Sequence, residues 1–280
     1  MAATLAPGGL TQLEVGADVY SALRDARRTI RNRDSGMLMF EDIVWPEARI
    51  TDVGLFARAE ETLGGGWRLV GTGRLDLVRA AAGTASDFFR ENVARDLSAS
   101  EANLSGAATL SYAPSAHWTV SLGLGSAVRT ADATERYADR LPASKAQTSA
   151  EFVGTPSLDP ERSTQGDLWV EASYPRWTLS LNTFARRLDN YITLAPTDLP
   201  PRLPLSPPTV FRYINGTAAF YGGELSAAYR LVDPLTARFT ASYLWGHDET
   251  LDEPVLGISP VQADASLRYE PVGGRFFAQG

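Results

Sequence analysis

The sequence of 280 residues has no cysteine, only two histidines and only three methionines. The absence of cysteine excludes disulfides and thiolate metal sites, and it leaves the cellular compartment open. No stretch approaches the roughly 18 consecutive apolar residues that a membrane-spanning helix needs. A basic surface is lacking too, because the formal net charge is −7, and this argues against a nucleic-acid-binding protein.

The N-terminus lacks the charged segment followed by an apolar one that is typical of a secretory signal peptide. Its first residues, Met1 to Val15, read instead as a turn followed by a strand. We therefore expect the chain to begin in the middle of its architecture.

Catalytic motifs are also missing. The two histidines, His117 and His247, are far apart, and neither nucleophile-elbow nor zinc-ligand spacing surrounds them. The glycine run 64–66 is not followed by a helix that could hold a phosphate, so we interpret it as a turn. His117 lies at a short turn and is interpreted as a solvated or interfacial side chain. The sequence predicts no enzyme and no cofactor.

What the sequence does contain is a strict alternation of apolar and polar side chains. Within residues 177–186, Trp177 and Leu179 lie on one face of the predicted strand, and Ser180 and Asn182 lie on the other. Side chains of a strand point alternately to opposite faces, so this period of two predicts a β-strand. The pattern recurs from residue 13 to residue 269, without a helical period of useful length.

Short turns and long loops alternate between these strands. The short turns are predicted at residues 63–66, 113–117, 174–176, 232–234 and 271–274, and we expect all of them at one end of the sheet. An aromatic residue lies beside almost every short turn on the apolar face: Trp67, Tyr112, Trp118, Tyr174, Trp177, Tyr229 and Tyr269. The polar face carries charges in mid-strand.

An outer-membrane β-barrel accounts for all of these features. Its strands direct apolar side chains to lipid and polar ones to a wet lumen, with short turns at one end, long loops at the other and aromatic girdles at the interfaces. A soluble antiparallel sandwich also alternates, but it explains the one-ended aromatics and the two loop classes less well. We predict that Leu179, Leu181, Phe239, Ala241 and Leu267 face lipid. We predict that Arg186, Glu224, Arg238 and Arg268 face the lumen.

Three motifs resemble those of the TonB-dependent outer-membrane receptors. Residues 154–171, GTPSLDPERSTQGDLWVE, are similar to the N-P-x-L-x-P-E-x-S-x-x-x-E-x-G signature that begins a late barrel strand of that family. Residues 213–225 resemble its Y-x-N-x-x-x-x-x-x-G-x-E strand, and residues 257–269 resemble its G-I-P-P segment ending in L-R-Y. The order and spacing of the three motifs identify the chain as a member of this family.

This resemblance implies an all-β fold, an antiparallel transmembrane β-barrel of about 22 strands with an N-terminal plug. Residues 1–280 would supply about 10–11 of those strands from the C-terminal side of the barrel. On this interpretation the plug domain, the energy-coupling box, the early strands and the closing strands are absent. We expect an open half-barrel with two unpaired edges.

The resemblance also implies a function. Such receptors take up a metal complex, such as a siderophore or copper, across the Gram-negative outer membrane, energised through TonB. The implied partners are outer-membrane lipid, the receptor's own plug domain, the TonB energy-coupling complex and the metal chelate. Two alternatives stay open: a passive porin or structural barrel, and a soluble β-sandwich binding module.

The sequence contains fewer indications of the substrate. Met37 and Met39 lie in the predicted loop after the first strand, and thioethers are soft ligands that suit Cu(I). Residues 129–137 are also similar to a segment of the copper-receptor subgroup. The two methionines are therefore candidate metal ligands, with incidental packing as the alternative. Six aromatic residues could line a vestibule for an aromatic siderophore or pack the loops together: Phe40, Trp45, Phe88, Phe89, Tyr137 and Phe152.

Overall fold

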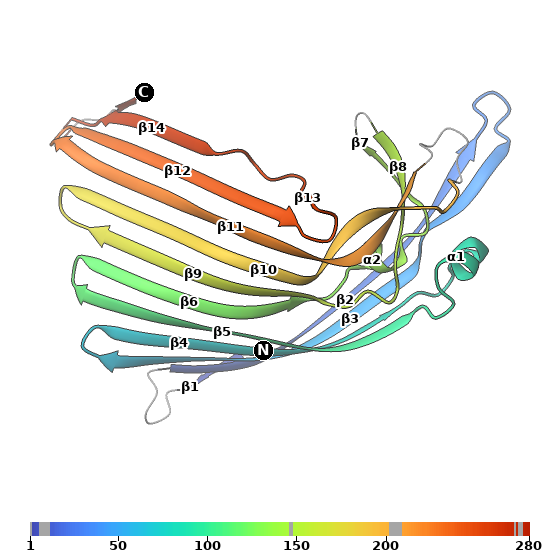
Figure 1. The fold of residues 1–280 in the computed structure, drawn as a ribbon, viewed down its shortest axis with the longest axis horizontal. Coiled ribbons are helices and arrows are strands. Elements are labelled where there is room, and N and C mark those ends of the chain that lie inside the picture. The colour runs from blue at the N-terminus through green and yellow to red at the C-terminus, as the bar shows by residue number, and fades with distance from the viewer. Residues whose placement is uncertain (1, 6–11, 146–147, 202–208, 272, 274–276) are drawn as a thin grey trace.

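The computed structural model describes residues 2–5, 12–145, 148–201, 209–271, 273 and 277–280. Within these residues the strands form one curved, open sheet in the order β1-β2-β3-β4-β5-β6-β9-β10-β11-β12-β14-β15, shown in Figure 1. The long strands are β2 (Gln12–Arg31), β3 (Leu38–Gly64), β4 (Trp67–Ala81), β5 (Ser98–Ser115), β6 (Trp118–Arg129), β9 (Glu161–Ser173), β10 (Trp177–Thr197), β11 (Val210–Val232), β12 (Leu235–Asp248) and β14 (Gln262–Tyr269).

Shorter elements occupy the connections and the edges. The short strands are β1 (Ala2–Leu5), β7 (Leu141–Lys145), β8 (Thr148–Val153), β13 (Glu253–Pro254) and β15 (Ala278–Gln279), and the helices are α1 (Asp87–Asn92) and α2 (Ala133–Tyr137). Neither described helix is long or apolar enough to cross a membrane. The structure thus confirms the predicted nearly all-β, antiparallel and unclosed sheet, in which β1 and β15 are the edges.

The short turns lie together at one end of the sheet, on the left of Figure 1. The residues that flank successive turns pair directly across neighbouring strands, which places each turn beside the next. These pairs are Trp67 with Tyr112, Trp118 with Ala172, Trp177 with Tyr229, and Leu235 with Tyr269. The prediction that the short turns share one end is confirmed; parts of the last turn, at residues 272 and 274, lie outside the described residues.

The register separates an apolar face from a polar one. Residues directly opposite each other in an antiparallel pair share a face. One such row contains Leu179, Ala227, Phe239 and Ala265, and the next contains Leu181, Leu225 and Ala241. The row between them carries Ser180, Ser226, Thr240 and Asp264, and the rows on their outer sides carry Arg238 with Ser266 and Glu224 with Ser242. The predicted division into two faces is confirmed, and contact of the apolar face with lipid stays a prediction.

The long loop predicted after the first strand, where Met37 and Met39 lie, was wrong for most of the charged stretch from Arg24 to Arg49. β2 and β3 continue through it as a hairpin that projects beyond the rest of the sheet (Figure 1). Register shifts at Ala26 and Ile30 interrupt the alternation, so the period of two is hidden in the sequence. At the tip the Asn32 side chain accepts the backbone N–H of Asp34 and Ser35, which closes the turn.

The long connection between β6 and β9 is also more ordered than the sequence predicts. It contains α2 and the β7–β8 hairpin, and β8 pairs in parallel with β11, Val210 lying opposite Glu151. A buried apolar cluster joins this connection to α1 and to the strands β3, β4 and β11. Its members include Phe89, Tyr137, Val153 and Val210. The end of the sheet opposite the short turns is therefore a packed assembly.

Candidate functional site

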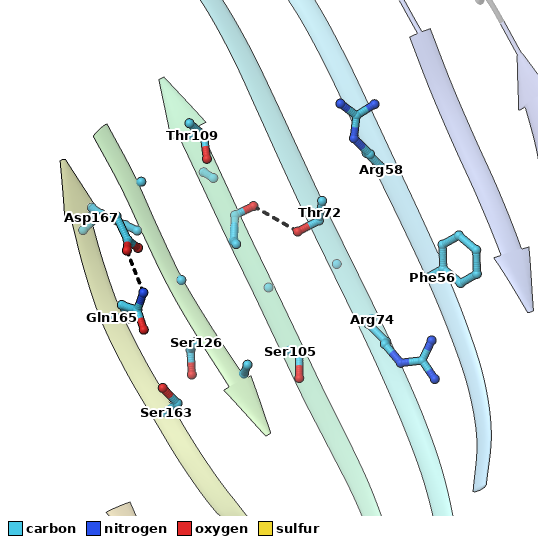
Figure 2. Close-up of a pocket in the computed structure, with 18 of the residues that line it drawn as sticks. Phe56, Arg58, Thr72, Arg74, Ser105, Thr109, Ser126, Ser163, Gln165 and Asp167 are labelled. Atoms are coloured by element: carbon cyan, nitrogen blue, oxygen red, sulfur yellow. Dashed lines mark hydrogen bonds between the residues drawn. The ribbon is translucent and has the colours of Figure 1, made fainter. Parts of the chain in front are cut away.

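The polar face carries a cavity of 680 Å³ over the middle of β3, β4, β5, β6 and β9. Figure 2 shows its lining, with Arg58 and Arg74 on one side and Gln165 and Asp167 on the other. The Gln165 side chain donates to the Asp167 carboxylate at 2.6 Å. This arrangement is a polar wall with room for water or a solute.

The arginines of this wall are held by carboxylates. Arg74 donates to both carboxylate oxygens of Asp18, at 2.7 and 2.9 Å, and also to Asp76 at 3.0 Å. Glu60 in turn accepts from Arg58 at 2.9 Å and from Arg68 at 2.8 Å. Paired charges of this kind suit a hydrated lumen and fix the side chains of the wall, but they offer no activated nucleophile.

At the long-loop end a buried arginine organises the connections. Arg136 of α2 is 1% exposed, and it donates to the carbonyl oxygens of Pro156 and Leu158 at 2.7 and 2.9 Å. The same guanidinium forms an ion pair with Glu101 of β5. An ionised group so deeply buried requires such partners. Arg136 therefore ties the 154–171 motif to the wall of the sheet.

The second motif segment is linked to the first by hydrogen bonds. Asn215 of β11 accepts the backbone N–H of Asp159 at 2.8 Å and donates to the Asp159 carbonyl at 3.0 Å. Thr155 donates to the carbonyl of Tyr213 at 2.6 Å, and Arg212 donates to the Thr155 hydroxyl at 2.8 Å. Two of the motifs found in the sequence are thus neighbours in space.

A capping box starts α2 and extends this network. The Asp132 side chain accepts the N–H of Glu135, and Glu135 accepts the N–H of Asp132, as in helices that begin with this pattern. Arg129 then bridges Glu135 at 2.9 Å and Glu161 at 3.2 Å. The segment 129–137 therefore acts as a brace for the loop.

Burial shifts two titratable groups of these loops. Burial raises the pKa of Tyr137 to about 12, so its phenol stays neutral. Burial also raises the pKa of Asp139, and hydrogen bonds from the backbone and hydroxyl of Ser86, at 2.8 and 2.9 Å, oppose that rise. Because neither group lies on the cavity, their shifts belong to loop packing.

The two candidate metal ligands lie at the tip of the β2–β3 hairpin. Met37 is 66% exposed and Met39 is 62% exposed. Met37 lies just before β3, and Met39 lies at the register shift between Ile30 and Arg31, so the strand alternation does not fix a common face for them. Within the described part of the chain, no group of three His, Cys, Asp or Glu side chains comes close enough together to hold a metal ion. The thioethers are accessible, and packing does not account for them.

The six aromatic candidates divide into different environments. Phe89 and Tyr137 are fully buried in the apolar cluster, so they pack the loops and do not line a vestibule. The Arg140 guanidinium covers the Phe88 ring at 3.3 Å, and Arg24 lies 5.8 Å from the Trp45 ring. Phe152 packs near Phe211. The side chain of Phe40 lies outside the described residues.

The structure keeps the two histidines apart. His117 stacks on Tyr174 with ring centroids 4.3 Å apart and bonds the carbonyl of Ser173 at 2.8 Å, beside the short turns. His247 lies on β12 and contacts Asp252 at 3.2 Å. Among the described residues, neither histidine belongs to a group of three His, Cys, Asp or Glu side chains that could hold a metal ion, and the interfacial interpretation of His117 stays a prediction.

Comparison with known proteins decides the family. Residues 3–280 match the family described as TonB dependent receptor-like, beta-barrel. The chain belongs to this family. Its members are outer-membrane proteins, and the structural neighbours are transporters and receptors. No curated protein matches the sequence.

Solved structures support the receptor fold. The copper transporter OprC aligns with a TM-score of 0.78 and 20% identity over 99% of this chain and 40% of its own. The FrpB iron transporter from Neisseria meningitidis has a TM-score of 0.61 and 16% identity, over 96% of this chain and 39% of its own. The Serratia marcescens hemophore receptor HasR, solved with its hemophore HasA and heme, has a TM-score of 0.59 and 17% identity, over 95% of this chain and 54% of its own. The chain thus spans about 40% of OprC.

Sequence reasoning missed the residues that brace the loop end of this receptor barrel. Arg136 and Asn215 lie in segments that the resemblance singled out, but their bracing role was not predicted, because their partners are far away in the sequence. The spacing of Asp132 and Glu135 is a capping-box signal that could have predicted α2. No local signal marks the parallel pairing of β8 with β11.

Proposed function

We propose that this chain is part of an outer-membrane receptor that takes up a metal complex, with energy supplied through TonB. The observation that carries the proposal is the family match over residues 3–280. The paired charges of the concave wall and its 680 Å³ cavity support a hydrated path along the inner face. The braced assembly at the long-loop end supports a fixed outer vestibule above that path.

An uptake assay tests the proposal. Cells of a Gram-negative strain that lack their own metal receptors would express the complete protein, with TonB intact or deleted. We expect uptake of a radiolabelled iron–siderophore or copper complex only in the strain with TonB. Equal uptake in both strains would instead favour the passive porin. Recovery of the protein in the soluble fraction without detergent would favour the β-sandwich module.

For the substrate class we propose a soft metal, with Met37 and Met39 as outer ligands. Both thioethers are exposed at the hairpin tip, two residues apart in the sequence. The test is copper-dependent growth of cells that carry Met37→Leu together with Met39→Leu. Leu38→Ala is the matched control, because Leu38 is exposed between them without a sulfur atom. Loss of copper uptake in the control as well, or in neither variant, would contradict this assignment.

A further inference from the structure

The apolar face ends at arginines on the long-loop side. Leu77 of β4 and Val53 of β3 lie opposite each other and are 49% and 38% exposed. Two residues further along each strand, on the same face, are Arg79 and Thr51, which again lie opposite each other. Arg49 follows on β3, opposite Ala81. Two exposed arginines therefore replace the aliphatic side chains in two successive rows of this face.

Arg49 and Arg79 are diagonal neighbours on this face. Such positions in an antiparallel pair are about 7–8 Å apart, within reach of long side chains. Within the described residues neither arginine forms an ion pair, whereas Arg58, Arg68 and Arg74 of the opposite face all do. Two like charges on neighbouring strands repel each other. A bound anion between them would remove this repulsion.

Hydroxyl groups complete this surface. Ser100 of β5 lies opposite Arg79, and Ser21 bonds Thr51 through the two hydroxyls at 3.0 Å. Three carboxylates lie near this area. Asp96 is held by the backbone and hydroxyl of Ser98 at 2.9 and 2.7 Å. Glu47 of β3 and Asp25 of β2 are exposed, and within the described residues neither forms an ion pair with Arg49 or Arg79. The arginine patch, defined as Arg49, Thr51, Arg79 and Ser100, thus offers cations and hydroxyls together.

The height of the patch matches a membrane boundary. Arg79 lies twelve residues along β4 from Trp67, which stacks on Tyr112 beside the short turns. A strand crosses the hydrocarbon core in about 9–11 residues, so Arg79 lies just beyond the opposite interface. A third exposed arginine, Arg162, lies eleven residues before Ser173 on β9 and bonds only neutral oxygens, those of Ser126 and Leu104.

We propose that the arginine patch binds the phosphate group of a lipid in the outer leaflet. The inference rests on the proposed outer-membrane location, where the long-loop end faces outward. Guanidinium groups bind phosphate through paired, charge-assisted hydrogen bonds. The acyl chains of the same lipid would lie along Val53 and Leu77. The bound phosphate would separate the two positive charges and anchor the receptor at a fixed depth.

The test compares two lipids on the complete protein, purified and folded in detergent. The probes are lipid A with both phosphates and lipid A with both phosphates removed, titrated by native mass spectrometry. We expect the phosphorylated lipid to bind at least about tenfold more tightly, a difference of about 1.4 kcal/mol. Arg49→Gln with Arg79→Gln should abolish the preference, and Arg79→Gln alone should reduce it if the double variant fails to fold.

Arg176→Gln is the matched control, because Arg176 is an exposed arginine at the short-turn end. It should bind both lipids as the unchanged protein does. The proposal is overturned if the unchanged protein shows no preference, if the variants at Arg49 and Arg79 keep it, or if the control loses it equally. Fractionation of the cells is read separately: absence from the outer membrane would contradict the proposed function, whatever the lipid titration gives.

Discussion

Asn215 and Asp159 exchange two hydrogen bonds across 56 residues of sequence, at 2.8 and 3.0 Å. Asn215 also donates to the carbonyl of Asn190 at 2.9 Å. One amide side chain thus fixes a loop before β9, the bulged part of β10 and the strand β11. The loop motif and the strand motif behave as one unit.

The first prediction concerns this amide. Asn215→Ala should lower the free energy of unfolding by about 0.5–1.5 kcal/mol, because it removes the hydrogen bonds that tie Asp159 and Asn190 to β11. The measurement is the midpoint of heat modification on gels. Asn32→Ala is the control: Asn32 also accepts exposed hydrogen bonds, but only from Asp34 and Ser35 of its own turn, so it ties no distant segments together. Equal shifts for both variants would contradict the bracing role.

The second prediction concerns Arg136. Arg136→Met should cost about 3–5 kcal/mol, because it leaves Glu101 as an unpaired, largely buried charge. Adding Glu101→Gln to this variant should restore part of the loss. Arg187→Met is the comparison, since the ion pair of Arg187 with Asp189 is exposed and worth about 1 kcal/mol at most. Denaturant titration measures all of them. A double variant that is no more stable than Arg136→Met alone would contradict this prediction.

The third prediction concerns the pH dependence of the loops. Burial raises the pKa of Asp139, so the folded loop favours the protonated carboxyl. Its stability should therefore rise as pH falls from the raised value toward 3.8, the ordinary value reached in the unfolded loop. The hydrogen-exchange protection factors of residues 83–97, which correct for the pH dependence of the intrinsic exchange rate, should rise on acidification. Asp139→Asn should remove this dependence, and an unchanged response in the variant would exclude Asp139 as its source.

The sequence predicted the parts of this fold that depend on local pattern. The alternation around Trp177 and Leu179 placed β10 and its faces, because side-chain direction in a strand follows from position alone. The part of the β2–β3 hairpin between Arg24 and Arg49 was missed because register shifts break the period of two there. The brace around Arg136 and Asn215 was missed because it depends on contacts between distant segments, which no local period encodes.

The last prediction separates the two faces by energy. Ala241 lies in the apolar row with Leu181 and Leu225, whereas Thr240 next to it points to the polar side, opposite Asp264 and Ser226. Ala241→Arg should cost about 2–4 kcal/mol near the bilayer midplane, because the charge must enter hydrocarbon. Thr240→Arg should cost much less, because the inner face is wet and Asp264 and Glu224 are near in the register. Folding titrations into lipid vesicles compare the two variants directly. Equal losses at both positions would mean that both faces meet the same solvent, as in a soluble sheet.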